Sequence, residues 1–295
     1  MSYGKPRVSI GMPVYNSERF LPETLDSLLT QTFADFELII SDNASADRTE
    51  EICRTYAAQD RRIRYLRNET NIGVYKNFNR VFLASSGEYF KWACADDVCH
   101  RDLIARCLEV LDNDPNVVLV YAKARFIDEA GKSLERADPG WNLQSDAAVE
   151  RLRYVIYSRH VINAFSGLMR TTELAKTRLF PTYKIGDYLL LGDLSLRGKF
   201  FEIPEYLFFR RIHQDASGQT PNGEWQKEYL PERYGRPGLP SWRICFDYLT
   251  IVMRSQLKVS QKLSLIGSIL YRIRLERPHL LGELATFSKS YIPHR

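Results

Sequence analysis

Several features that define common protein classes are scarce or missing in this 295-residue sequence. Its five cysteines are odd in number, lack the paired spacing of a zinc site and lie among apolar residues, so we interpret them as reduced thiols in a reducing compartment. The first residues lack the apolar core of a signal peptide, and no run reaches the roughly 18 apolar residues of a membrane span. We therefore expect a cytoplasmic protein, with peripheral attachment at the inner face of the membrane as an alternative.

A glycine-rich phosphate loop is also missing. The turn after the first predicted strand, Met12–Ser17, contains no glycine, which argues against a nicotinamide-binding Rossmann enzyme. A Walker lysine loop is absent as well. Any bound nucleotide must therefore be held through side chains and a metal.

A net positive charge is absent from most of the chain. The net charge is +5, but residues 241–295 contain nine Lys or Arg and three acidic residues, which leaves the first 240 residues at −1. A main domain without a basic field argues against nucleic acid as its partner. The length and the 44% hydrophobic content are sufficient for one large domain with an appendage.

Apolar runs and helical periodicity alternate along the chain. Strands are predicted at Val8–Val14, Phe36–Ile40, Ile63–Leu66, Tyr89–Cys94, Val117–Tyr121 and Glu202–Phe209, and helices near 18–31, 47–60, 74–84, 103–113 and 189–196. This alternation predicts a mostly parallel α/β sheet, in which ligands bind beyond the carboxyl ends of the strands. Three polar clusters follow strands: Pro13–Asn16, Asp42–Ser45 and Asp96-Asp97. Together they predict a pocket at one edge of the sheet.

Two adjacent carboxylates, Asp96 and Asp97, end the apolar run Tyr89–Cys94. Their mutual repulsion is costly unless another charge offsets it. A divalent cation would do so, and carboxylate oxygens suit Mg²⁺ or Mn²⁺. A solvated turn before a helix N-terminus is the alternative.

Five short motifs follow one another in a specific order: Val8–Asn16, Gln31–Glu37, Ser41–Ser45, Asn71–Gly73 and Ala95–Asp97. Their joint order and spacing resemble those of family 2 glycosyltransferases with the GT-A fold, over about residues 7–213. The resemblance implies an inverting transfer of a sugar from a nucleotide-diphosphate donor to an acceptor hydroxyl. It also implies a divalent metal, Mn²⁺ or Mg²⁺, that bridges the diphosphate. Family analogy alone suggests cell-surface glycan or polysaccharide synthesis and a glycan or lipid-linked acceptor.

The same resemblance implies roles for residues of the first half. Asp42 would contact the nucleobase above a floor of Pro13 and Tyr15, Asp96 would lie near the ribose, and Asp97 would ligate the metal. The nucleotide-binding set is completed by Asn16 and Asn71. Many relatives carry a further aspartate two residues before the acidic pair, where this chain has Cys94.

An inverting transfer also needs a base that takes the proton from the acceptor hydroxyl. The resemblance places an acidic residue about 90 positions after the metal pair, and Asp187 fits, although it could instead cap a helix. Asp193, further along the helix, is the weaker candidate.

Five further residues complete the predicted site. Ser166 and Gly167 form a small-residue turn that would lie against the sugar and the acceptor, unless it is an ordinary loop. After the last strand, His213 would complete the metal shell or meet the diphosphate, unless it is a satisfied polar residue. Arg210 and Arg211 would neutralise the departing diphosphate.

The resemblance implies a GT-A-like catalytic domain at 1–213. Beyond it, the composition indicates a Gly/Pro-rich loop or flap at 214–240 and a helical basic C-terminal extension at 241–295. The extension contains an apolar stripe of Val259, Leu263, Ile266, Leu270 and Ile273. This stripe either packs on the catalytic domain or contacts anionic lipid as an interfacial helix.

Two other classes of function stay open. A sugar nucleotidyltransferase would need a glycine-rich basic triphosphate loop after its first strand, and Pro13–Ser17 is not one. A non-catalytic nucleotide- or glycan-binding protein would keep the pocket without a base.

Overall fold

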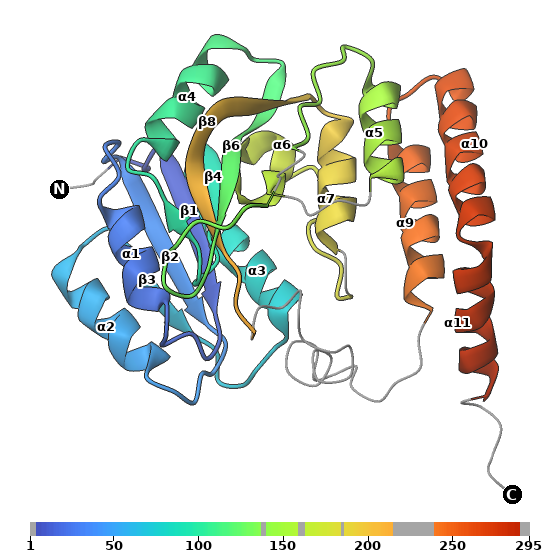
Figure 1. The fold of residues 1–295 in the computed structure, drawn as a ribbon. Helices are drawn as coiled ribbons and strands as arrows, with labels where there is room; N and C mark the ends of the chain where they lie inside the picture. The colour runs from blue at the N-terminus through green and yellow to red at the C-terminus, as the bar shows by residue number, and fades with distance from the viewer. Residues whose placement is uncertain (1–3, 137–139, 159–162, 184–185, 215–238, 290–295) are drawn as a thin grey trace, which may run out of the picture.

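The computed structural model describes residues 4–136, 140–158, 163–183, 186–214 and 239–289. Its centre is an eight-stranded sheet with helices on both faces, and helices α9 to α11 stand to one side of the sheet (Figure 1). The strands are β1 Val8–Val14, β2 Phe36–Asp42, β3 Ile63–Arg67, β4 Tyr89–Trp92, β5 Val98–Cys99, β6 Val117–Ile127, β7 Leu168–Arg170 and β8 Lys199–Arg211.

The helices alternate with these strands through the first two-thirds of the chain. They are α1 Leu21–Leu29, α2 Thr49–Gln59, α3 Val74–Leu83, α4 Leu103–Asn113, α5 Ala148–Tyr157, the short 3₁₀ helix η1 Ala164–Ser166, α6 Thr171–Leu174, α7 Gly186–Ser195, α9 Pro240–Arg254, α10 Val259–Leu275 and α11 Arg277–Lys289. No helix among the described residues has the length and hydrophobicity needed to cross a bilayer.

The strand order is β3-β2-β1-β4-β7-β6-β8-β5. Strand β1 pairs in parallel with β2 on one side and with β4 on the other, so the strand order reverses there. The turns that follow β1, β2 and β4 carry the three polar clusters singled out in the sequence. The predicted α/β fold is therefore confirmed, and the three clusters follow the carboxyl ends of these strands.

The sheet is less parallel than expected. Strand β7 runs antiparallel to β4 and β6, and β5 runs antiparallel to β8. Periodicity did not reveal β7, because three residues are too few to show a period. Strand β6 is longer than the predicted Val117–Tyr121, since it pairs in parallel with β8 as far as Ile127 and Arg211.

Buried side chains form a separate core on each face of the sheet. One core lies beneath α1 and α4, with Leu25 and Leu108 among its members, and the other lies beneath α3 and α7, with Val81 and Leu191. A third core joins α5 and α7 to α9 and α10. The C-terminal helices therefore share buried contacts with the helical side of the first domain.

Helix α10 packs through a different face from the stripe noted in the sequence. Its buried side chains are Leu265, Ser268 and Ile269, which belong to the third core or lie beside it. Leu263 is 63% exposed, and the stripe residues Val259 and Leu270 are exposed as well. The interpretation that this stripe covers the catalytic domain is therefore wrong for these three residues, whereas Ile266 and Ile273 are partly buried against the core. The predicted flap at 214–240 lies almost entirely outside the described residues.

Candidate active site

The acidic pair follows β4, where the chain leaves the sheet. Asp97 is buried, and its Oδ1 accepts a hydrogen bond from the backbone N–H of Arg211 at 3.0 Å. Burial raises the pKa of Asp97 to about 7, the neighbouring Asp96 charge acts in the same direction, and the Arg210 charge opposes both. Asp96 is more accessible, and its Oδ2 lies 3.0 Å from Nε2 of His213. The structure thus brings three predicted site residues together.

Arg210 of β8 carries a positive charge that acts on both the acidic pair and the predicted base. Its guanidinium donates to Oδ1 of Asn163 at 3.0 Å, and its charge opposes the larger effect of burial on the pKa of Asp97 and of Asp187. Asp187 is in the first turn of α7 and accepts a hydrogen bond from the N–H of Tyr188 at 3.1 Å. Burial is the larger effect and raises the pKa of Asp187 above its ordinary value. The charge of Arg210 therefore favours the ionised form of Asp97 and of Asp187, against the effect of burial.

Asp193, the alternative base, is occupied elsewhere. It lies six residues after Asp187, which places it on another side of α7. Its carboxylate is buried, bonds to the Arg197 guanidinium at 3.1 Å and accepts from the N–H of Arg178 at 3.3 Å. It also lines a small hollow beside α9 with Asp247 and Ile251. These contacts assign Asp193 to packing between α7 and α9.

At the opposite end of the site, Asp42 terminates β2 and has no exposed surface. Its Oδ1 accepts from the N–H of Ser45 at 2.8 Å, and its Oδ2 accepts from the Tyr65 hydroxyl at 2.7 Å and from the Arg67 guanidinium. Asp42 therefore holds β2, β3 and the turn after β2 together. A direct contact with a nucleobase stays a prediction, and it would require one of these partners to move.

An amide network beside Asp42 was not predicted from the sequence. Asn43 donates to Oδ1 of Asn71 at 2.7 Å, and Asn68 donates to Oδ1 of Asn43 at 2.9 Å and to that of Asn77 at 3.1 Å. Asn71 Oδ1 also accepts from the N–H of Gly73, where α3 begins. The network fixes the turns after β2 and β3 to the start of α3. Its only sequence signal is a group of asparagines near strand ends.

The floor residues lie at the end of β1. Pro13 pairs with Ser41 in the β1–β2 register, and Tyr15 is half-buried just after the strand. Asn16 has a φ of +47°, a conformation that asparagine tolerates better than most residues. Its Oδ1 accepts from the N–H of Ala46 at 2.9 Å, which ties this turn to the turn after β2. The first two polar clusters are thus joined directly.

Arg211, which was predicted to bind the diphosphate, is engaged inside the protein. Its side chain is only 1% exposed and donates to the backbone carbonyls of Asp96, Asp128 and Glu129. It also pairs with Glu23 at 2.5 Å. Successive side chains of a strand point to opposite faces, so Arg210 and Arg211 cannot both serve one ligand. Arg211 fixes the backbone that carries the acidic pair, and we withdraw it from the diphosphate-binding set.

Packing explains why residue 167 is a glycine. A Cβ on Gly167 would lie 2.6 Å from the carbonyl oxygen of Val120, so this glycine permits the close approach of η1 to β6. The Ser166 carbonyl accepts a hydrogen bond from the ammonium of Lys91, a buried residue of β4. Contact of Ser166 with a sugar or an acceptor stays a prediction.

Lys91 is a second feature that sequence reasoning missed. Its positive charge lowers the pKa of Asp97, and its Nζ lies 5.4 Å from the ring centroid of Phe208. The available signal was a lysine inside an otherwise apolar strand. Together, Lys91 and Arg210 partly compensate the acidic pair from inside the protein.

The donor set at this site fits a hard divalent cation. Ligand atoms of Cys94, Asp96 and Asp97 lie within 4.8 Å of one another, and His213 contacts Asp96. Carboxylate oxygens and an imidazole nitrogen are ligands that Mn²⁺ accepts. Burial raises the pKa of the Cys94 thiol well above its ordinary value, so this residue is a poor thiolate donor.

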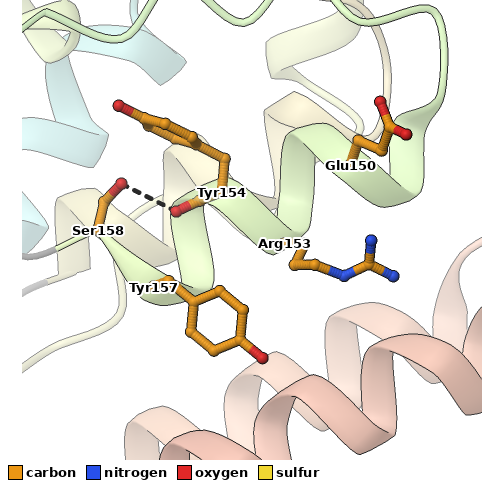
Figure 2. Close-up of a pocket in the computed structure, with 5 residues that line it drawn as sticks. All are labelled: Glu150, Arg153, Tyr154, Tyr157 and Ser158. Atoms are coloured by element: carbon orange, nitrogen blue, oxygen red, sulfur yellow. Dashed lines mark hydrogen bonds between the residues drawn. The ribbon is translucent and has the colours of Figure 1, made fainter.

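A shallow hollow on the outer side of α5 lies apart from these residues. Figure 2 shows its lining, with Tyr154 and Tyr157 on α5 and Arg153 pointing toward α10. The Arg153 guanidinium donates to the Ser264 hydroxyl of α10 at 2.7 Å. This hollow therefore belongs to the α5–α10 boundary.

Fold and site together define an α/β protein with polar clusters at the carboxyl ends of its central strands, an acidic pair suited to a metal, and a separate buried carboxylate at the start of α7. The sequence model of glycosyl transferase family 2 matches residues 9–211. This chain belongs to that family.

Similar proteins agree with this assignment. An uncharacterized glycosyltransferase of Rickettsia prowazekii is 35% identical over 224 residues, which cover 74% of this chain and 66% of that protein. The chain spans 47% or less of the length of several other curated relatives that it matches.

Solved structures share the fold. The crystal structure of Staphylococcus aureus TarS 1–349 in complex with UDP-GlcNAc has a TM-score of 0.71 at 17% identity and covers 95% of this chain and 80% of that one. The mannosyltransferase PcManGT from Pyrobaculum calidifontis, in complex with GDP-Man and Mn²⁺, has a TM-score of 0.55 at 15% identity and covers 98% of this chain and 81% of that one. At these identities the likeness establishes the GT-A-like fold alone.

Proposed function

We propose that this chain transfers a sugar from a nucleotide-diphosphate donor to a hydroxyl of a glycan or lipid-linked acceptor in the synthesis of a cell-surface glycan, with inversion at the anomeric carbon. The observation that supports the proposal is the acidic pair after β4, where ligand atoms of Cys94, Asp96 and Asp97 lie within 4.8 Å of one another and His213 contacts Asp96. This group would hold a metal for the donor diphosphate, and the buried carboxylate of Asp187, in the first turn of α7, would serve as the base. Family membership supports the reaction class, and the TarS and PcManGT complexes make UDP-GlcNAc and GDP-mannose the first donors to test.

In the proposed reaction, the acceptor hydroxyl gives its proton to the Asp187 carboxylate as its oxygen forms a bond to the anomeric carbon. The bond from that carbon to the diphosphate breaks, and its electron pair leaves on the diphosphate oxygen. Arg210 stabilises the charge that develops there. Its hydrogen bond to Asn163 holds the guanidinium in place. Burial of Asp187 strengthens it as a base by raising its pKa.

A Mn²⁺ or Mg²⁺ ion would be held by Asp97 and His213, with Asp96 beside it. When bound, it would supply positive charge to the diphosphate. Asp42 and the Asn43–Asn71 network would shape the nucleotide end, over Pro13, Tyr15 and Asn16.

The experiment is a two-stage screen of the purified chain. Nucleotide sugars are first ranked by thermal stabilisation with and without Mn²⁺, since a ligand at about 100 times its Kd stabilises by roughly 2.7 kcal/mol. Donors that bind are then incubated with free glycans and with lipid-linked oligosaccharides, and the product linkage is read by NMR. Donor binding without transfer or hydrolysis would identify a non-catalytic binding protein, and a product of retained configuration would contradict the inverting mechanism. Formation of a nucleotide sugar from a nucleoside triphosphate and a sugar phosphate would instead indicate a nucleotidyltransferase.

A further inference from the structure

Helices α9 to α11 leave a large apolar surface unpartnered among the described residues. On α10, Val259 is 74% exposed and Leu270 is 57% exposed, with Leu263 between them on the same side of the helix. Tyr271 and Leu275 extend the exposed surface around α10, and Met253 does so at the end of α9. Because Leu265 and Ile269 anchor the opposite side of α10 in the core, this surface cannot turn inward without breaking that core. We call Val259, Leu263, Leu270, Tyr271 and Leu275 the α10 surface.

The charges around the α10 surface are of one sign. Arg274 lies within it, and Arg254, Lys258 and Arg277 are exposed near the ends of α9 and α10 or at the start of α11. Among the described residues, none of these four side chains is paired with a carboxylate. Each can therefore face an external anion.

The carboxylates of α9 to α11 are, by contrast, directed inward. Asp247 bonds to Arg178 and Tyr183, Glu276 bonds to Arg272, and Glu283 bonds to Ser241. Their side chains are only 12–15% exposed. Within residues 239–289 the carboxylates therefore face inward, one of them paired with the equally buried Arg272, whereas Arg254, Lys258, Arg274 and Arg277 are exposed.

From this combination we infer that the α10 surface rests on an anionic lipid bilayer. Apolar side chains would enter the boundary between headgroups and acyl chains while the flanking cations meet lipid phosphates. Tyrosines suit the same zone because one end of the ring is apolar and the other is polar. Tyr271 packs edge to face against Tyr157 of α5 at 6.1 Å, and Figure 2 shows Tyr157 pointing toward α10. A second copy of this chain fits less well, because pairing two such surfaces would bring like charges together.

The test is sedimentation of the full chain with vesicles of phosphatidylcholine alone or mixed in equal parts with phosphatidylglycerol. We expect binding to the mixed vesicles only, weakened by salt. The double variant Leu263→Gln/Leu270→Gln should bind at least about tenfold more weakly, since two apolar anchors are lost. Removing the charges in Lys258→Gln/Arg274→Gln should weaken binding by about fivefold per residue.

Two controls are matched to these variants. Leu83→Gln removes an exposed leucine from α3, on a different part of the molecule, and should leave binding unchanged. Arg48→Gln/Arg54→Gln removes two exposed arginines from the α2 region and should have little effect. Circular dichroism and a melting curve establish that each variant is folded.

Parental protein that stays in the supernatant with anionic vesicles would overturn the inference, as would a Leu263→Gln/Leu270→Gln variant that binds like the parent. Light scattering measures whether the chain forms a dimer through the α10 surface. A dimer that dissociates in the same double variant would assign the α10 surface to a second copy and exclude lipid as its occupant. None of these readouts depends on glycosyl transfer, so they can fail independently of the proposed function.

Discussion

Two leucines of α10, two residues apart, provide a matched test of how this helix packs. Leu265 has no exposed surface and contacts the core shared by α5, α7 and α9, whereas Leu263 is 63% exposed. Replacement by alanine removes the same atoms at both positions. A buried leucine truncated in this way costs about 2–5 kcal/mol, because transfer free energy is lost and a cavity remains. A surface substitution of this kind usually changes stability by no more than about 0.5 kcal/mol.

We therefore expect Leu265→Ala to lower the free energy of unfolding by about 2–5 kcal/mol, and Leu263→Ala to be nearly neutral. The corresponding drop in melting temperature for Leu265→Ala is roughly 4–20 °C for a domain of this size. Urea unfolding followed by circular dichroism measures both variants, with the slope m compared to detect any loss of cooperativity. Equal costs at the two positions, or a larger cost at Leu263, would refute the orientation of α10 and with it the exposed α10 surface.

Three further predictions concern the site. The proposed base must be deprotonated to accept a proton and its pKa is raised, so turnover should fall as the pH is lowered through a value above that of an ordinary aspartate. Initial rates against pH measure this limb, and a limb that persists in Asp187→Asn would assign it to another group. Asp97→Asn should abolish the Mn²⁺-dependent part of the thermal stabilisation by a nucleoside diphosphate, and unchanged stabilisation would contradict the metal assignment. Asp42→Asn should cost about 1–3 kcal/mol of stability, since a buried acceptor of three hydrogen bonds is altered, and should weaken nucleoside monophosphate and diphosphate binding alike. Calorimetry that shows a loss confined to the diphosphate would contradict its place at the nucleobase.

Hydrophobic periodicity in the sequence predicted the long strands and helices, and the position of polar residues after strands predicted which clusters meet. The predicted strand Val8–Val14 and the helix Leu103–Asn113 coincide with β1 and α4. The polar clusters at Pro13–Asn16 and Asp42–Ser45 meet because the carboxyl ends of parallel strands share one edge. Short elements such as β7 were missed, since their pairing is decided by distant residues.

Side-chain direction accounts for the other differences. Two adjacent arginines looked equivalent in the sequence, but the alternation of a strand sends Arg211 inward to backbone carbonyls and leaves Arg210 to donate to Asn163. On α10, apolar residues occupy most of the circumference, so the period could not show that Leu265 and Ile269 form the buried side. The choice depends on the neighbouring helices α5 and α9, which periodicity within one segment does not describe.

The central claim is that Asp187 removes the acceptor proton, and the most direct measurement is single-turnover transfer by Asp187→Asn. Asparagine keeps the size of aspartate and most of its hydrogen bonding but has no basic oxygen at neutral pH. Transfer should fall by about 100-fold to 10,000-fold, or roughly 3–5 kcal/mol of transition-state free energy, with donor affinity and melting temperature close to parental. The control is Asp193→Asn on the same helix, which should lose stability through its contact with Arg197 but keep its rate. Near-parental transfer by Asp187→Asn would contradict the account.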